Sequence, residues 1–207
     1  MTLPDILVAG HRHFREGFPG AEDRYRQLAT EGQKPPALVI GCCDSRSAPE
    51  SIFGSGPGEL FVVRNVANIV PPYQPDAHFH GTSAAIEYAV DVLEVEHVLV
   101  LGHAGCGGIQ AALGNAPRTD SAFIGNWVLP LAQLAGSVQV PPGPAAAKDR
   151  ATALERLAVL ASIANLRTFP FVSEREKAGR LALHAGWFDI PTGRLWVHED
   201  DVWQVCE

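Results

Sequence analysis

Three short runs of apolar residues constrain the fold of this 207-residue chain more than any other feature. The runs are continuous rather than alternating, and each has the length of a buried strand. Strands of this kind are typical of parallel sheets that helices cover on both faces. We therefore expect central parallel strands at Ala37–Gly41, Leu60–Val63 and Val98–Leu101.

Segments with helical periodicity alternate with these runs. Residues 5–32 are expected to be helical, with a break at Gly17–Gly20, where two glycines and a proline interrupt the pattern. Apolar residues recur at intervals of three and four within Thr82–Leu93 and Asp149–Leu166. This spacing predicts two amphipathic helices, each with one face on the core.

The C-terminal part of the chain adds two expected strands, Gly186–Ile190 and Arg194–Val197, on either side of a turn. The Pro/Ala-rich segment Val140–Ala147 is expected to join two helices rather than two domains. Strands that alternate with helices predict an α/β fold, here a single domain with a mainly parallel central β-sheet flanked by helices. We divide it into an N-terminal helical arm, residues 1–34, and an α/β core, residues 35–207.

Chemically versatile side chains follow two of the three apolar runs. A Cys-Cys-Asp-Ser-Arg motif occupies positions 42–46, directly after the first run, and His-Ala-Gly-Cys occupies 103–106, after the third. Ligands gather outside the carboxyl ends of parallel strands, so a shared sheet edge brings the two motifs together. Zn²⁺ favours thiolate and imidazole ligands, and three protein ligands leave a fourth position for a reactive water. We predict a catalytic metal site at Cys42, His103 and Cys106.

Other interpretations of the same residues stay open at this level. A single cysteine at a strand end is more often a small buried apolar residue. Asp44 is a possible helix cap with Arg46 as its surface partner, and it is also a possible fourth metal ligand that would close the site. The joint arrangement favours the metal site, because capping does not explain a His-x-x-Cys motif at the end of a second strand.

Composition and charge exclude several other classes of protein. Hydrophobic residues make up 46% and charged residues 19%, as in ordinary globular domains. A net charge of −7 argues against a nucleic-acid partner, and no apolar run approaches the roughly 20 residues that span a bilayer. The N-terminal residues lack the pattern of a secretory signal, and four cysteines are too sparse for a disulfide scaffold. We expect a cytoplasmic protein without a membrane partner.

Motifs along nearly the whole chain resemble those of the β-class carbonic anhydrases of bacterial type. The matching segments are Cys-x-Asp-Ser-Arg at 42–46, Phe-Val-Val-Arg-Asn-Val-Ala-Asn at 61–68, Gly-Thr-Ser-Ala-Ala-Ile-Glu-Tyr at 81–88, His-x-x-Cys-Gly-Gly at 103–108 and Gly-Trp-Phe-Asp-Ile at 186–190. The resemblance implies a zinc lyase, a carbonate dehydratase. Such an enzyme hydrates CO₂ reversibly to bicarbonate and a proton by attack of zinc-bound hydroxide.

The resemblance also implies roles for individual residues. Zn²⁺ would be held by Cys42, His103 and Cys106, and Asp44 and Arg46 would form the catalytic dyad. The residues implied to contact substrate are Gln33, Phe61, Val66, Tyr88 and Gly107. Gln33, Phe61 and Tyr88 would come from the neighbouring subunit, so activity would require a homodimer or a dimer of dimers.

The resemblance also bears on the fourth coordination position of the metal. Gln33 matches family members whose site stays open, and Val39 stands where members prone to a closed site have tryptophan. Gly41, in contrast, is shared with the members prone to a closed site. Arg46 would keep Asp44 off the metal by pairing with it. We expect the open form at neutral to alkaline pH.

Two rival functions remain. The first is an enzyme on the same scaffold that acts on a CO₂ analogue such as carbonyl sulfide or carbon disulfide. The second is a silent zinc-binding or redox-sensing protein, against which the intact Asp44, Arg46 and Gln33 count.

The remaining cysteines and histidines are not assigned to the site. Cys43 is expected to point to the opposite face of the strand from Cys42, where it would be buried and bind no metal. Cys206 is expected to be a bystander near the terminus, and the pairs His11/His13 and His78/His80 to lie on a solvated surface.

Overall fold

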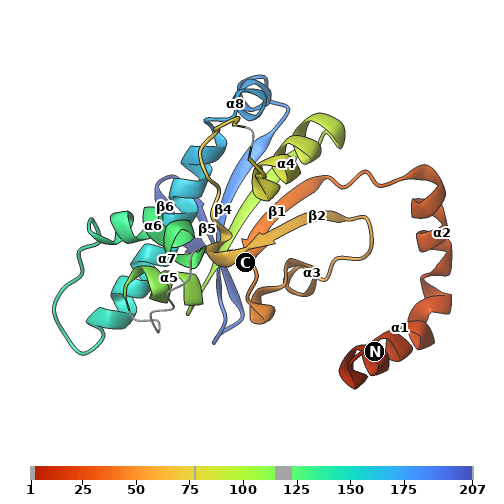
Figure 1. Cartoon of the computed structure of the whole chain (residues 1–207), viewed down its shortest axis with the longest axis horizontal. Coiled ribbons are helices and arrows are strands. Elements are labelled where there is room, and N and C mark those ends of the chain that lie inside the picture. Colours follow the sequence, from red (N-terminus) through yellow and green to blue (C-terminus); the bar gives the residue numbers. More distant parts are fainter. Residues whose placement is uncertain (1–2, 77, 115–122, 207) are drawn as a thin grey trace. The chain divides into compact units, whose positions relative to one another are not determined.

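The computed structural model describes residues 3–76, 78–114 and 123–206 (Figure 1). They form two compact units, and the boundary in the sequence lies between Lys34 and Pro35. The first unit consists of α1 (Asp5–Gly17), the 3₁₀ turn η1 (Phe18–Gly20) and α2 (Glu22–Glu31). The predicted helices and their break are therefore confirmed. None of the residues in these three elements is buried.

A six-stranded sheet forms the middle of the second unit (Figure 1). The strands lie in the order β2-β1-β3-β4-β5-β6; the first four run parallel, and β5 and β6 are antiparallel to their neighbours. They are β1 (Ala37–Cys42), β2 (Leu60–Asn65), β3 (His97–His103), β4 (Ala182–Asp189), β5 (Arg194–Glu199) and β6 (Val202–Val205). This confirms the expected α/β fold with a mainly parallel sheet.

Helices and single turns flank the sheet. They are η2 (Ser45–Ser47), α3 (Pro49–Ile52), η3 (Val66–Asn68), α4 (Gly81–Glu87), η4 (Tyr88–Val92), α5 (Gly107–Ala112), α6 (Ile124–Ala135), α7 (Ala146–Leu166) and α8 (Pro170–Lys177). The long helix α7 packs on β3 and β4, whereas α4 packs on β2. Helices α5, α6 and α7 also contact one another. Within the described ranges, no helix combines the length and apolar character needed to cross a membrane.

The three apolar runs do not have equal positions in the sheet. β1 lies between β2 and β3 and is almost wholly buried, as the sequence predicts. β2 is an edge strand, however, and all six of its residues are only half-buried. The prediction of a central strand at Leu60–Val63 is therefore wrong for the isolated chain, because nothing in the run itself tells an edge from the centre. An apolar edge of this kind is usually covered by another element or another chain.

The predicted helix Thr82–Leu93 changes from α-helical to π-helical geometry after Glu87. α4 ends at Glu87, and the chain continues as a π-helical turn, η4, in which the Leu93 amide donates to the Tyr88 carbonyl at 2.9 Å. Such turns are rare and often occur at functional sites. The turn begins at Tyr88, whose side chain is 46% exposed.

A glycine allows α7 to lie close to β3. A Cβ atom at Gly102 would meet a methyl carbon of Val159 on α7 at 2.7 Å, which is shorter than any normal carbon–carbon contact. The neighbouring Leu154 and Ala158 are both buried. The close approach brings the middle of α7 against the end of β3.

We predict that Gly102→Ala destabilises the protein by about 1–3 kcal/mol, the usual effect of overpacking a core. Thermal unfolding followed by circular dichroism measures the change. Gly10→Ala is the control, because no atom lies within 4 Å of its new methyl group and alanine favours a helix. An unchanged melting temperature in Gly102→Ala would contradict the tight contact.

Candidate metal centre

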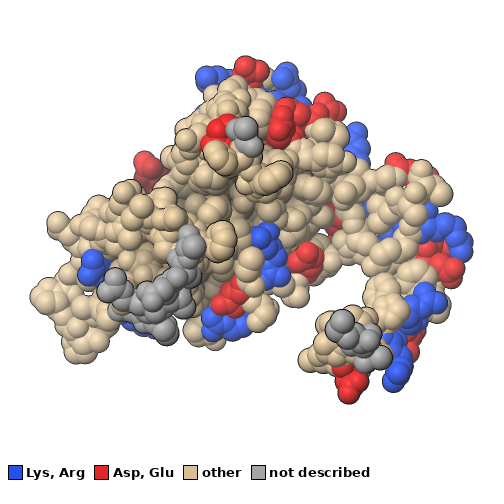
Figure 2. Space-filling view, viewed as in Figure 1, with Lys and Arg blue, Asp and Glu red and all other residues tan. Residues whose placement is uncertain are grey.

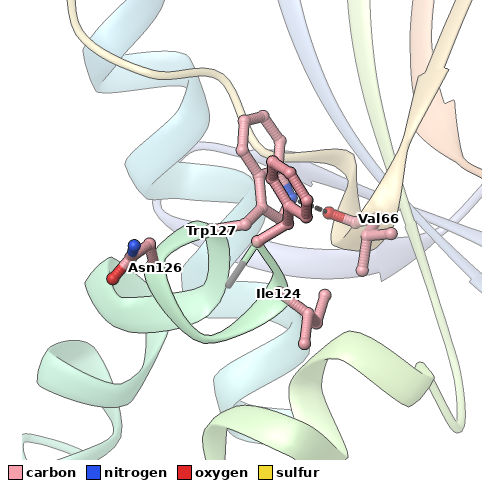
Figure 3. A pocket seen from close by; sticks show the side chains of 5 residues that line it. Val66, Ile124, Asn126 and Trp127 are labelled. Atoms are coloured by element: carbon pink, nitrogen blue, oxygen red, sulfur yellow. Dashed lines mark hydrogen bonds between the residues drawn. The ribbon is translucent and has the colours of Figure 1, made fainter. Parts of the chain in front are cut away.

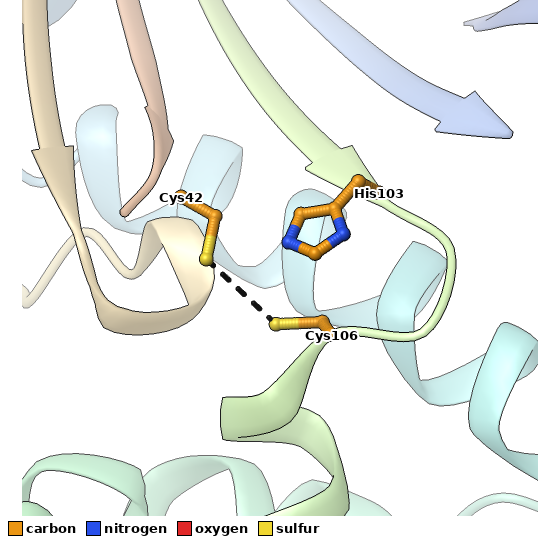
Figure 4. Close-up of side chains that lie close together, drawn as sticks. All are labelled: Cys42, His103 and Cys106. Carbon is orange, nitrogen blue, oxygen red and sulfur yellow. Dashed lines mark hydrogen bonds between the residues drawn. The ribbon is translucent and has the colours of Figure 1, made fainter. Parts of the chain in front are cut away.

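Two neighbouring strands position the predicted ligands. Cys42 is the last residue of β1 and His103 is the last residue of β3, and the register aligns Gly41 with Leu101. The two side chains therefore leave the same edge of the sheet from adjacent strands. Cys106 follows three residues later, immediately before α5. Figure 4 shows the three side chains converging, with both sulfur atoms near the imidazole ring.

The potential ligand atoms of Cys42, His103 and Cys106 all lie within 4.8 Å of one another, and all three residues are buried. The two Sγ atoms are 4.0 Å apart. His103 Nδ1 lies 3.0 Å from the Ala104 carbonyl oxygen, to which it can donate. In the described part of the chain, the buried Nε2 has no hydrogen-bond partner. A buried nitrogen without a partner beside two sulfurs fits a bound metal ion, and this ligand set suits Zn²⁺.

The pKa values of the two cysteine thiols are shifted in opposite directions. The pKa of Cys42 is lowered to about 4, mainly because the Cys106 side chain forms a hydrogen bond with it. The pKa of Cys106 is raised, first by that same hydrogen bond and then by burial. The two opposite shifts favour one thiolate and one thiol that keeps its proton. A divalent cation would displace that proton and stabilise both thiolates.

Asp44 and Arg46 form a two-pronged ion pair beside this cluster. The Arg46 Nε and Nη2 atoms donate to Asp44 Oδ1 at 2.9 Å and to Oδ2 at 2.7 Å. The backbone N–H of Arg46 donates to Asp44 Oδ1 as well, at 3.0 Å. The Arg46 hydrogen bonds hold the pKa of Asp44 far below its usual range. Asp44 is therefore ionised at neutral pH, and it is not part of the three-residue ligand cluster.

Two charged residues that the sequence motifs do not assign to the site hold its backbone. On β2, Arg64 donates from Nε to the Cys42 carbonyl and from Nη2 to the Asp44 carbonyl, both at 2.7 Å. On α7, the Glu155 carboxylate accepts hydrogen bonds from the amides of Gly105 and Cys106 at 2.8 and 3.2 Å. Each residue fixes one of the two ligand-bearing segments.

The sequence does contain a signal for Glu155. It lies between Leu154 and Ala158 on the buried face of α7, where the helical period predicts apolar residues, and it is only 3% exposed. Burial raises the pKa of Glu155, while the hydrogen bonds from Cys106, Trp187 and Gly105 oppose the rise. A charged residue on the apolar face of a core helix is itself an indication of a polar partner.

Residues predicted to contact substrate lie in several elements. Phe61 of β2 and Tyr88 of η4 form a ring pair with centroids 5.8 Å apart. Val66 of η3 is 37% exposed, and Gly107 is the first residue of α5. Gln33 belongs to the separate N-terminal unit, in the segment after α2.

Val66 also borders an open apolar pocket of about 640 Å³. The other lining residues are Phe123, Ile124, Asn126 and Trp127. Figure 3 shows the Trp127 indole reaching over to η3, where its Nε1 donates to the Val66 carbonyl at 2.8 Å. This bond ties α6 to the segment that follows β2.

Comparison with known proteins identifies the family. The family model described as carbonic anhydrase matches residues 37–195. A carbonic anhydrase of Pseudomonas aeruginosa is 40% identical over 93% of this chain and 86% of its own length. The solved structure of the β-carbonic anhydrase CcaA superimposes with a TM-score of 0.84 at 29% identity, over 98% of this chain and 92% of CcaA.

A tetrameric β-carbonic anhydrase from the ascomycete Sordaria macrospora matches at 32% identity with a TM-score of 0.69, over 91% of this chain and 96% of its own. The chain belongs to the β-class carbonic anhydrase family. It is accordingly a carbonic anhydrase enzyme, and the family resemblance inferred from its motifs is confirmed.

Two further cysteines lie outside the Cys42–His103–Cys106 cluster. Cys43 is exposed, so the prediction that it is buried is wrong. The reason is that β1 ends at Cys42, and the alternation of a strand no longer applies to the next residue. Cys206 is exposed, as expected for a bystander.

The paired histidines lie at the surface, as predicted. His11, His13 and His78 are exposed, and His80 is half-buried with Nε2 2.7 Å from Asp76 Oδ1. The hydrogen bonds from His80 and His78 lower the pKa of Asp76 to about 2.

We predict that Cys106→Ser lowers the affinity for Zn²⁺ by at least about 100-fold, because the cluster loses a thiolate. Competition with a chromophoric chelator measures the affinity. Cys43→Ser is the matched control, since it removes an exposed thiol one residue from a ligand. Equal zinc binding by Cys106→Ser and the wild type would exclude Cys106 as a ligand.

Proposed function

We propose that the chain catalyses the zinc-dependent, reversible hydration of CO₂ to bicarbonate and a proton. One observation carries the proposal. A buried Cys-His-Cys cluster lies beside an ionised Asp44 held by Arg46, in a chain of the β-class carbonic anhydrase family. The three ligands would be Cys42, His103 and Cys106.

When bound, zinc would act as a Lewis acid that acidifies a coordinated water and so supplies a nucleophile for CO₂. The two thiolates offset the charge of the cation, so the surrounding residues contribute more than in an all-histidine site. Asp44 would make this contribution, and its ionised, hydrogen-bonded carboxylate supports the assignment. It would accept a hydrogen bond from the nucleophile and turn a lone pair toward the carbon of CO₂.

Arg46 has the second task of keeping Asp44 away from the metal. Its guanidinium contacts both carboxylate oxygens, and its Nη2 also lies 3.4 Å from the Gly105 carbonyl of the ligand loop. This arrangement favours an open fourth position. Breaking the pair would free Asp44 to become a fourth ligand and close the site.

The substrate pocket is proposed to form between two subunits. Gln33, Phe61 and Tyr88 would come from one chain, and Val66 and Gly107 from the chain that holds the metal. Residues 1–34 and 35–207 would then act together as one carbonic anhydrase domain in each subunit, with the arm supplying Gln33.

The surface of the isolated chain supports such an assembly. The half-buried edge strand β2, the unburied helices of the arm and the exposed Tyr88 are all surfaces that a second chain can cover. Figure 2 shows a largely uncharged surface on one face of residues 35–207, with charged side chains in small, mixed groups. The tetrameric relatives also support a homodimer or a dimer of dimers. We propose a cytoplasmic location, where Cys42 and Cys106 stay reduced as the metal requires.

We predict that Asp44→Asn lowers kcat/KM for CO₂ hydration by about 100-fold or more, the usual contribution of a positioned proton acceptor. Zinc content should stay near that of the wild type. Because the pKa of Asp44 lies far below neutrality, the carboxylate is ionised throughout pH 6.5–9, and the loss should be similar across this range. Stopped-flow hydration with a pH indicator measures it.

Asp76→Asn is the matched control, since it alters another hydrogen-bonded aspartate away from the cluster. Full activity of Asp44→Asn at wild-type zinc content would refute the role of Asp44. A zinc-loaded wild type that hydrates carbonyl sulfide or carbon disulfide but not CO₂ would favour the rival substrates. Inactivity with all three would favour a silent zinc protein.

A second prediction tests the shared pocket. Asp44→Asn and Gln33→Ala should each be impaired, but co-expressed chains should form mixed dimers with one intact site. Half of the dimers are mixed at equal expression, so the mixture should reach about one quarter of wild-type activity. Activity no higher than the mean of the two parent variants would argue that Gln33 acts within its own chain.

A further inference from the structure

Glu155 has an unusual environment for a carboxylate. It lies in the middle of α7 and is 3% exposed, next to Leu154 and Ala158 of the apolar cluster that also contains Cys42 and Cys106. Burying a charged group without compensation is very unfavourable, so such a group normally neutralises or is fully hydrogen-bonded. Both carboxylate oxygens of Glu155 accept hydrogen bonds.

Three N–H groups donate to this carboxylate. Oε1 accepts from the backbone amides of Gly105 at 2.8 Å and Cys106 at 3.2 Å, and Oε2 accepts from the Trp187 indole at 3.1 Å. All three partners are donors and none accepts a proton. The arrangement therefore suits an ionised carboxylate, because the O–H of a carboxylic acid would face another donor.

The two amides belong to the loop that separates two predicted ligands. Gly105 has a φ of +66°, a left-handed conformation that reverses the chain between His103 and Cys106. One carboxylate oxygen bridges the amides on both sides of this reversal. The indole of Trp187 on β4 holds the other oxygen, so the carboxylate links the loop, α7 and β4. Gly102 makes this reach possible by letting α7 lie against β3.

We propose that Glu155 is a positioning residue of the metal centre. It fixes the backbone of the His103–Cys106 loop and thereby the direction of the Cys106 sulfur relative to the His103 imidazole. Metal ligands are commonly oriented by such partners, and losing one typically weakens metal binding 10–100-fold. The role rests on the proposed function, because it presupposes zinc at the Cys42–His103–Cys106 cluster.

The substitution Glu155→Gln tests the role with almost no change in shape. A glutamine can offer its carbonyl either to the loop or to Trp187, and its NH₂ group then faces the remaining donor. We expect about 10–100-fold weaker Zn²⁺ binding by chelator competition. The apoprotein loaded with Co²⁺ should also show changed d–d and thiolate-to-metal absorption bands, which report ligand geometry directly.

A second substitution separates positioning from simple packing. Trp187→Phe alone keeps the bonds to the loop and should bind zinc within about threefold of the wild type, since no loop contact is lost. In Glu155→Gln/Trp187→Phe the competing indole donor is gone, so the amide carbonyl can face the loop. We expect this double variant to recover part of the affinity and of the Co²⁺ spectrum lost in Glu155→Gln.

Ser162→Ala is the control for loss of a buried hydrogen bond on the same helix. Its hydroxyl contacts the Val70 amide and the Asn68 carbonyl, both outside the ligand loop. It should lower the melting temperature and leave zinc affinity unchanged. Should Glu155→Gln fail to fold, Glu155→Asp carries the same prediction, because its shorter side chain cannot reach the loop and Trp187 together.

Wild-type zinc affinity and an unchanged Co²⁺ spectrum in a folded Glu155 variant would overturn the positioning role while leaving the proposed function intact. An equal loss of affinity in Ser162→Ala would overturn it too, because general destabilisation would then explain the effect. Failure of the wild type to bind zinc would overturn the proposed function, and the role of Glu155 with it.

Discussion

The parallel pairing of β1 with β3 is the constraint on which the candidate metal centre depends. Because neighbouring parallel strands end at the same edge of a sheet, Cys42 and His103 meet although 60 residues lie between them in the sequence. The following turn at Gly105 returns Cys106 to the same place. Had the strands been antiparallel, the two motifs would leave opposite edges. The sheet thus brings the cluster together, and the helices cover it and hold its loops.

Around this edge, each charged group is held by hydrogen bonds to defined partners. Asp44 is held by Arg46, the Cys42–Asp44 backbone by Arg64, and the loop before Cys106 by Glu155. The charges are costly to place near a buried cluster, and each is offset by short hydrogen bonds. These hydrogen bonds hold the Cys42–Asp44 and His103–Cys106 segments in place, which suits a metal site with three protein ligands and an open fourth position.

The sequence predicted what depends on local pattern. The three apolar runs identified β1, β2 and β3, the segments on either side of the C-terminal turn identified β4 and β5, and the helical period identified the arm and α7. The positions of Cys42 and His103 at strand ends, with Cys106 three residues further on, predicted that the three side chains converge. The local pattern carries no information about which segments lie next to one another in space. Nothing in Leu60–Val63 marks an edge strand, and Cys43 differs from a buried residue only because β1 stops one position earlier. Glu155 and Arg64 act on backbone groups far away in the sequence, and no spacing rule identifies such contacts.

The proposed activity is the hydration of CO₂ by this cluster when it holds zinc. The most direct measurement is a titration of metal-free wild-type protein with Zn²⁺, in which bound zinc and the initial rate of CO₂ hydration by stopped flow are determined on the same samples. We expect the rate to rise in proportion to bound zinc and to level off at about one ion per chain, as for a single three-ligand site. Full loading without hydration, or hydration that does not depend on zinc, would contradict it.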